Sequence, residues 1–166
     1  MSEGSEKPID RMTGSAGRVR AFLESHGLDG GLVHFEQSTK TAQMAADAMG
    51  CELGQIVKSL VFVVDDRAVL ALVAGDRRGD TGAIARLMEG AKAAFADPDT
   101  VRAATGYAIG GVSPFALPED LPVFIDDSLE RFEVVYPAGG TPSSMVRMTF
   151  AQLLDISGGR IAAIAR

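Results

Sequence analysis

Hydrophobic positions near the start of the chain recur with the spacing of an amphipathic helix. One apolar face is formed by Val19, Phe22, Leu23 and His26. Gly27 can end such a helix in a left-handed conformation, so the pattern predicts a helix over 18–26. The alanine-rich segment 42–49 predicts a second helix, because Thr41 is a suitable N-cap and Gly50 a suitable terminator.

Two longer apolar runs dominate the middle of the chain. Segments 57–64 and 68–74 are rich in β-branched residues and leucine, and only residues 65–67 separate them. This pattern predicts a β-hairpin with a short polar loop. Because apolar residues occupy both faces of these strands, we expect them at the centre of a sheet.

The remaining segments are shorter and alternate irregularly between helix and strand patterns. Further helices are predicted over 81–88, over 98–104 and from residue 150 onward, with Asp80 or Thr81, Asp97 and Thr149 as their caps. Short strands are predicted over 32–36, 92–96, 123–126, 132–136 and 145–148. Several connecting loops are too short for parallel crossovers. The sequence therefore predicts an α+β fold with a mixed, mainly antiparallel sheet and surrounding short helices.

The composition fits one compact domain. A chain of 166 residues with 46% hydrophobic side chains can bury a sizeable core, which we expect over 15–166. Residues 1–14 lack an apolar run, so they are expected to form a flexible tail and no export signal. No apolar stretch approaches the roughly 20 residues that a membrane-spanning helix needs, so no membrane association is expected.

Charge and cysteine content exclude several classes of protein. The 22 acidic and 16 basic side chains give a net charge of −6, which argues against DNA binding and against a broad basic RNA-binding surface. Any contact with RNA must be local, and Arg77, Arg78 and Arg86 are candidates for a basic patch. With one cysteine and two histidines the chain offers no clustered metal ligands, so we expect a cytoplasmic protein without a metal or other cofactor.

Lys58 is the most informative single residue. It lies within the apolar segment 56–62, where an unpaired ammonium is costly to remove from water. The side chain either reaches solvent from the start of the strand or presents a cation at the rim of a pocket. In the second case it would meet a phosphate or a polarised carbonyl. The pattern leaves both interpretations open.

Two glycine pairs mark turns that can approach a ligand closely. Gly110 and Gly111 precede Ser113-Pro114-Phe115, and their backbone N–H groups could form an oxyanion hole. Gly139 and Gly140 lie in a later turn that could form the other wall of a pocket. Glycine pairs are also common in ordinary turns, and neither pair has the spacing of a nucleotide-binding fingerprint.

The other reactive residue types are assigned structural roles. Cys51 follows a helix terminator and has no evident base, so we interpret it as a buried thiol. His26 and His34 are interpreted as packing or surface residues. Asp126-Asp127 is interpreted as a strand-end turn or helix cap, because adjacent strand residues point to opposite faces.

Several of these segments occur together in an order that resembles the YbaK/prolyl-tRNA-editing family of free-standing aminoacyl-tRNA deacylases. The matching segments are Gln55–Val61, Thr105-Gly106-Tyr107 leading to Gly110–Phe115, Leu121-Pro122 through Ile125-Asp126, and Ala138-Gly139-Gly140. The likeness runs from about Arg18 to the C-terminus. Separated motifs in the right order are more specific than any one of them, so the resemblance favours a functional role for Lys58 and the first glycine pair.

The resemblance implies a largely antiparallel, barrel-like sheet and hydrolysis of mischarged tRNA for proline, with relatives fused into bacterial prolyl-tRNA synthetases. It implies no metal. It assigns the catalytic positions to Lys58, Gly110 and Gly111. The substrate-binding positions that it implies are Thr41, Ser59, Ser113, Pro114, Phe115, Gly139, Gly140 and Met145.

Met145 separates this chain from the cysteine-removing branch of the family, which has an acidic residue there. An apolar wall makes alanine, 2-aminobutyrate, serine and threonine as suitable as cysteine. We therefore expect a trans-editing hydrolase in which water attacks the ester while Lys58 holds the phosphate or ester end. The expected partners are the acceptor end of mischarged tRNA(Pro) and, as a weak partner, prolyl-tRNA synthetase. The alternatives are a non-catalytic module that binds aminoacyl-adenosine or a protein, and an esterase for small free aminoacyl esters.

Overall fold

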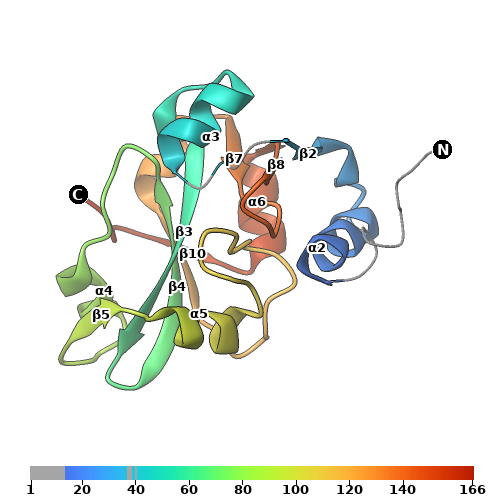
Figure 1. Cartoon of the computed structure of the whole chain (residues 1–166). Coiled ribbons are helices and arrows are strands. Elements are labelled where there is room, and N and C mark those ends of the chain that lie inside the picture. Colours follow the sequence, from blue (N-terminus) through green and yellow to red (C-terminus); the bar gives the residue numbers. More distant parts are fainter. Residues whose placement is uncertain (1–13, 37–38, 40) are drawn as a thin grey trace.

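The computed structural model describes residues 14–36, 39 and 41–166 (Figure 1). The helices are α2 (Gly14–Ser25), α3 (Ala42–Met49), α4 (Thr81–Leu87), α5 (Pro98–Thr105) and α6 (Phe150–Ser157), and the short 3-10 helices are η1 (Asp29–Gly31), η2 (Leu53–Gln55) and η3 (Asp127–Arg131). The strands are β2 (Leu32–His34), β3 (Ile56–Val64), β4 (Arg67–Ala74), β5 (Ala93–Phe95), β6 (Val123–Asp126), β7 (Val134–Pro137), β8 (Ser144–Val146), β9 (Met148–Thr149) and β10 (Arg160–Ala162). Residues 1–13 of the predicted tail lie outside the described residues, whereas Gly14 already belongs to α2.

The helix starts follow the predicted caps. In α3, α4, α5 and α6 the cap side chain accepts a hydrogen bond from a backbone N–H of the first turn, and the caps are Thr41, Asp80, Asp97 and Thr149. Gly50 ends α3 with a φ of 67°, the left-handed conformation expected of it. The structure confirms these predictions. They could be made from the sequence because a cap depends only on residues a few positions apart.

The β3–β4 hairpin forms the centre of the sheet, as its two apolar faces predicted. Among the described residues the main sheet has seven strands in the order β10-β6-β4-β3-β7-β9, with β5 also paired to β3. Strands β2 and β8 form a separate pair. Side chains on one face of the hairpin, such as Leu70 and Leu72, pack into one core cluster, and those on the other face, such as Val69 and Val73, pack into a second.

The sheet is mixed, which confirms the predicted α+β class. The pairs β3–β4, β3–β5, β7–β9 and β2–β8 are antiparallel. Strand β6 runs parallel to β4 and β10, and β7 runs parallel to β3. Parallel neighbours are reached here through long connections, and the segment between β4 and β6 contains α4, β5 and α5.

Two features of the C-terminal half differ from the predictions. The expected strand 145–148 is divided at Arg147, whose N–H donates to the carbonyl of Gly31, so that β8 pairs with β2 and β9 with β7. A side chain at Gly31 would collide with the Arg147 carbonyl, at 2.2 Å. Strand β10 was not predicted, because a three-residue edge strand carries too little apolar pattern.

The helices lie around the ends and sides of the sheet (Figure 1). The long β3–β4 hairpin runs through the centre, with α3 near one end and α4, β5 and α5 near the other. Helix α2 lies to one side, close to β2. None of the described helices combines the length and the apolar character needed to cross a membrane.

Candidate active site

A gap in the pairing of β3 opens beside the centre of the sheet. Strand β7 pairs with the first two residues of β3, and β5 pairs with Phe62–Val64. Between them, at 58–61, no described strand continues the sheet on that side. The Ile56 carbonyl accepts a hydrogen bond from the Gly75 N–H on the β4 side. Because such bonds alternate along an antiparallel strand, the backbone N–H and C=O of Ser59 face the gap.

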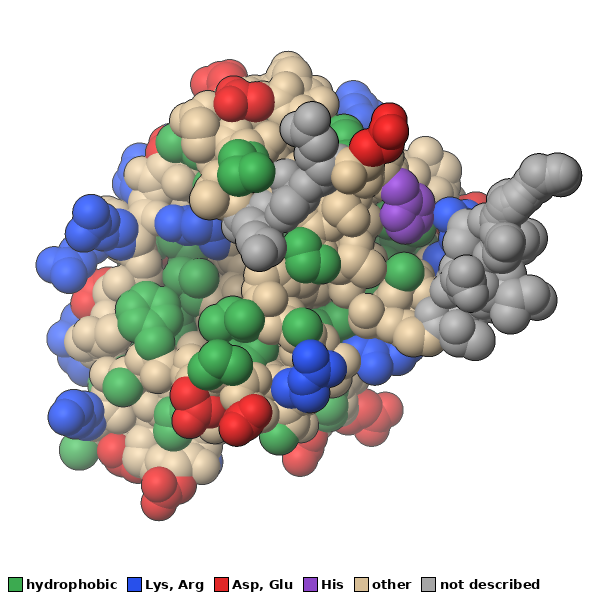
Figure 2. Space-filling model, in the orientation of Figure 1, with side chains coloured by type: hydrophobic (Ala, Val, Ile, Leu, Met, Phe, Trp, Pro, Cys, Tyr) green, Lys and Arg blue, Asp and Glu red, His purple; other side chains and the backbone are tan. Residues whose placement is uncertain are grey.

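A cavity of about 320 Å³ lies at this gap. Most of its lining is apolar: Ala42, Ala45, Ile56, Val57, Leu60, Ile109, Val112, Ala138 and Met145. The rest consists of Thr39, Thr41, Lys58, Ser59 and Gly110. Figure 2 shows apolar side chains gathered around the hollow centre of this face. The volume is at the small end of the range for ligand pockets, so the cavity suits a small side chain with the groups next to it.

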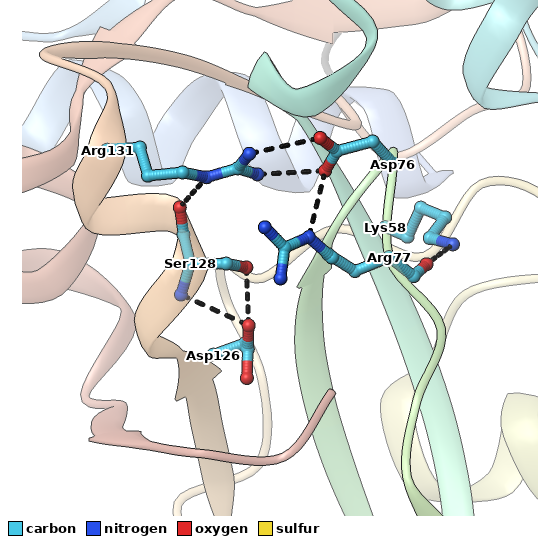
Figure 3. Close-up of polar contacts among 6 residues, drawn as sticks. All are labelled: Lys58, Asp76, Arg77, Asp126, Ser128 and Arg131. Carbon is cyan, nitrogen blue, oxygen red and sulfur yellow. Dashed lines mark hydrogen bonds and ion pairs between the residues drawn. The ribbon is translucent and has the colours of Figure 1, made fainter. Parts of the chain in front are cut away.

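Lys58 supplies the charge among the described lining residues. Its ammonium donates a hydrogen bond to the carbonyl oxygen of Arg77 (Figure 3). Burial lowers the pKa of Lys58 below its ordinary value; nearby Asp76 raises it and Arg78 lowers it further. Lys58 is therefore a half-buried cation that lines the cavity. This position fits the interpretation of Lys58 as a cation at the rim of a pocket.

An ion-pair network holds the segment that accepts the Lys58 hydrogen bond. Arg131 on η3 contacts both carboxylate oxygens of Asp76, at 3.0 and 2.8 Å, and the Asp76 carboxylate also lies 3.8 Å from the Arg77 guanidinium (Figure 3). The hydrogen bond from Arg131 is the main reason why the pKa of Asp76 lies below its ordinary value. Arg131 is itself fixed by a 2.6 Å bond to the Ser128 carbonyl. The network thereby links the exit of β4 to η3.

The two glycines of the first pair have different surroundings. Gly110 lines the cavity and has a φ of 89°, a backbone conformation that suits glycine. The Gly111 N–H donates to the Ala108 carbonyl at 3.0 Å, and a Cβ at Gly111 would lie 3.0 Å from the Thr141 backbone. Gly110 therefore faces the cavity, whereas Gly111 permits close packing of two loops.

The second glycine pair lies against the protein core. A Cβ at Gly139 would lie 2.8 Å from the side chains of Leu32 and Ser144. Gly140 has a φ of 102°, and a Cβ there would lie 2.8 Å from Val19 of α2. Neither glycine belongs to the cavity lining, but the preceding residue, Ala138, does. This turn contributes to the wall through Ala138 while its glycines pack against α2 and β2.

Ser113, Pro114 and Phe115 are buried away from the cavity lining. The Phe115 ring stacks on Phe22 with 5.7 Å between ring centroids, and its carbonyl accepts a hydrogen bond from the Tyr107 hydroxyl. These contacts anchor the far end of the Gly110 loop in the main core. The structure thus separates the residues of this motif into a cavity-facing glycine and a buried anchor.

Three of the expected substrate-binding residues do line the cavity: Thr41, Ser59 and Met145. The hydroxyl of Ser59 is buried and has no hydrogen-bond partner among the described residues. Such a group is costly unless a ligand or water satisfies it. Thr39 and Ile109 also line the cavity but were not singled out from the sequence. Ile109 lies within the glycine motif, so its position beside Gly110 was the available signal.

The remaining candidate groups have structural positions. Cys51 is partly buried, and burial, assisted by Glu52, raises the pKa of its thiol. Asp126 caps η3 by accepting hydrogen bonds from Ser128 and also binds the N–H of Ile164 at 2.9 Å, which confirms the predicted cap. Within residues 14–36, 39 and 41–166, no group of three or more His, Cys, Asp or Glu side chains is placed to hold a metal ion.

Comparisons with known proteins connect this geometry to a family. The sequence profile of the "Aminoacyl-tRNA editing domain" matches residues 36–156. YwhH of Bacillus subtilis (strain 168), an uncharacterized protein, is 35% identical over 144 residues, which cover 86% of this chain and 91% of the relative. The multifunctional Ser/Thr-tRNA deacylase ProXp-y of Escherichia coli (strain K12) is 32% identical over 138 residues, which cover 80% of this chain and 82% of the relative.

A solved structure gives the same result at the level of the fold. This crystal structure, described as a candidate trans-editing enzyme for prolyl-tRNA synthetase, superimposes with a TM-score of 0.85 and 42% sequence identity. The match covers 98% of this chain and 99% of that chain. Taken with the profile match, it places the chain within a known class of enzyme. The chain therefore belongs to the aminoacyl-tRNA editing domain family, the YbaK-like aminoacyl-tRNA deacylases that its sequence motifs indicated.

Proposed function

We propose that this protein acts in trans on mischarged tRNA, chiefly tRNA(Pro), and removes a small non-cognate amino acid. The observation that carries this proposal is that Lys58 and Gly110 both line one small and mainly apolar cavity. An aminoacyl ester at the end of a tRNA combines a negatively charged phosphate, a carbonyl that gains charge in the transition state and a small side chain. Each of these has a matching group at the cavity.

In the proposed reaction, water attacks the ester carbonyl, the carbonyl carbon–ribose oxygen bond breaks, and the amino acid leaves as its carboxylate. The Gly110 N–H stabilises the oxyanion that forms, and Lys58 holds the phosphate or ester end in place. The described lining residues include no carboxylate, histidine or cysteine. In this proposal a group of the substrate or solvent takes the proton of the attacking water, the departing ribose oxygen takes up a proton, and no covalent acyl-enzyme forms.

The lining of the cavity favours small substrates with a hydroxyl group. Met145 and Ala45 are buried and apolar, so this wall offers no charge to bind a polar side chain. Ser59 lines the same cavity, and its buried hydroxyl has no partner among the described residues, so a change of its rotamer would present a hydrogen-bonding group to a substrate. Serine and threonine are therefore proposed as the preferred amino acids, ahead of alanine, 2-aminobutyrate and cysteine. The name of the Escherichia coli relative, a Ser/Thr-tRNA deacylase, supports this order.

The net negative charge of the chain limits how the tRNA can be bound. Arg77 and Arg78 lie next to Lys58 and offer a local contact for phosphates at the acceptor end. Arg86, the third residue of the predicted patch, lies on α4. The proposal includes a weak complex with prolyl-tRNA synthetase, which would hold the tRNA body. The expected place of action is the cytoplasm.

The proposal is tested by charging tRNA(Pro) separately with serine, threonine, alanine, 2-aminobutyrate, cysteine and proline, and by measuring the initial rate of deacylation. Rapid loss of the seryl and threonyl esters and a stable prolyl ester are expected. Fast cleavage of free aminoacyl ethyl esters would instead support the small-ester esterase. Binding of the charged tRNAs with no cleavage of any of them would support the non-catalytic module and contradict the proposal.

A further inference from the structure

An exposed apolar surface lies beside the cavity. Phe95 and Ile109 are 63% and 59% exposed, which is high for large hydrophobic side chains. Both line a second hollow of about 80 Å³. This hollow shares Ser59, Leu60, Ile109, Gly110 and Val112 with the main cavity. The exposed surface is therefore continuous with the wall of the cavity.

The Phe95 ring is held in place by the sheet. Strand β5 pairs with β3 so that Phe95 lies opposite Phe62, and the two ring centroids are 4.5 Å apart with 36° between the ring planes. Phe62 is fully buried. An aromatic ring that is exposed to solvent and supported from behind by a core residue is suited to stacking with a flat partner.

The chemistry of the substrate suggests what that partner is. If the proposed function holds, the ester in the main cavity is attached to the ribose of the terminal adenosine, so the adenine base must lie within a few ångströms of the cavity mouth. Bases stack on aromatic side chains in proteins that bind single-stranded nucleic acid. We propose that the hollow formed by Phe95 and Ile109 binds the adenine base of the acylated tRNA end. This inference rests on the proposed function and adds a base-binding subsite to it.

Charge favours a neutral base over phosphates at this position. Asp97 and Asp99 follow Phe95 at the start of α5 and are exposed, so they disfavour a phosphate there. Arg77 and Arg78 lie next to Lys58 at the exit of β4, and none of these three basic residues lines the hollow. Figure 2 shows basic side chains along one flank of this face and acidic ones below the apolar cluster. The base would thus occupy the apolar hollow, and the phosphates of the tRNA would lie along the basic residues.

The test uses a ligand that cannot be hydrolysed. In 3′-serylamino-3′-deoxyadenosine an amide replaces the ester, and the uridine counterpart differs only in the base. Calorimetric titration should give about 10-fold tighter binding of the adenosine compound, because a purine stacks more strongly than a pyrimidine. Phe95→Ala should remove this preference, and Phe95→Trp should retain it. Ile161→Ala, which alters an exposed side chain on β10, serves as the matched control.

Equal affinity for the two compounds, or no measurable affinity for either, would overturn the adenine subsite. A base preference that survives in Phe95→Ala would also overturn it, and weaker binding of that variant to prolyl-tRNA synthetase would then identify the surface as a protein contact. Deacylation of seryl-tRNA(Pro) by the unmodified protein is measured in parallel. If the ester is cleaved but the compounds bind equally, only the subsite is wrong; if no mischarged tRNA is cleaved, the proposed function is wrong.

Discussion

The ammonium of Lys58 donates a hydrogen bond to the main-chain carbonyl of Arg77, where the chain leaves β4 (Figure 3). An ammonium has three N–H donors, and this is the bond that the described residues provide for it. Two donors remain for oxygen atoms of a substrate. The bond therefore fixes the position of the ammonium without neutralising it, since a carbonyl carries no net charge.

Replacing Lys58 tests the role of this cation directly. Lys58→Ala should lower kcat/KM for seryl-tRNA(Pro) by about 100-fold, which is the effect of removing one preorganised donor to a developing charge. The melting temperature should not fall, because the variant no longer has to bury an ammonium. Lys92→Ala removes an exposed lysine and should leave the rate unchanged. Wild-type turnover by Lys58→Ala would exclude Lys58 from the mechanism.

The pH dependence should reflect the lowered pKa of Lys58. Burial favours the neutral amine, so the ammonium is lost at a lower pH than in an ordinary lysine. The value of kcat/KM should therefore fall as the pH rises through this pKa, after subtraction of spontaneous ester hydrolysis. In Lys58→Arg the guanidinium stays charged, so the alkaline decline should disappear from any remaining activity. An identical decline in that variant would assign it to another group.

Asp76 should act as a positioning residue. Asp76→Asn loses the two-pronged contact with Arg131 and should cost about 1 kcal/mol or less of folding free energy, because the pair is exposed to solvent. As the pH falls from the ordinary aspartate pKa through the lowered pKa of folded Asp76, the stabilities of the two proteins should converge, since the ion pair contributes stability only while the carboxylate is ionised. The alkaline decline in activity should also move to lower pH, because Asp76 raises the pKa of Lys58. An unmoved decline would contradict this coupling.

The Ser59 hydroxyl should affect specificity and stability in opposite ways. Ser59→Ala removes a buried hydroxyl that lacks a protein partner, so the free energy of unfolding should rise by about 1 kcal/mol. The ratio of seryl to alanyl turnover should fall about 10-fold, because a polar contact with the substrate is lost. Ser113→Ala alters a buried hydroxyl outside the cavity and should leave this ratio unchanged. An unchanged ratio in Ser59→Ala would remove Ser59 from substrate selection.

The two adjacent glycines should respond differently to alanine. Gly111→Ala places a methyl group 3.0 Å from the Thr141 backbone and should lower stability by about 1–3 kcal/mol. Gly110→Ala strains an exposed loop at positive φ, so loop movement should relieve much of the strain and kcat should fall more than stability. Thermal melts and initial rates of both variants separate these effects. If Gly111→Ala lowered the initial rate but left the melting temperature unchanged, the assigned roles would be reversed.

Local features of this protein could be read from its sequence. The caps Thr41, Asp80, Asp97 and Thr149 and the terminator Gly50 act within one turn of helix, so residue type and spacing are sufficient to identify them. The hairpin loop is equally local: Asp65 and Asp66 both have positive φ, as a tight turn between twisted strands requires. The motif resemblance indicated Lys58 and Gly110, and both of these residues line the cavity.

Only the tertiary structure decided which strands lie beside which. The gap in β3 exists because β7 and β5 pair with different ends of the strand, and neither strand is its neighbour in the sequence. The same long-range packing turned Phe115 into the core, placed Gly140 against α2 and left Phe95 exposed over Phe62. Glycines and aromatic residues look alike in a sequence whether they face a ligand or a neighbouring segment, because that choice depends on contacts between residues far apart along the chain.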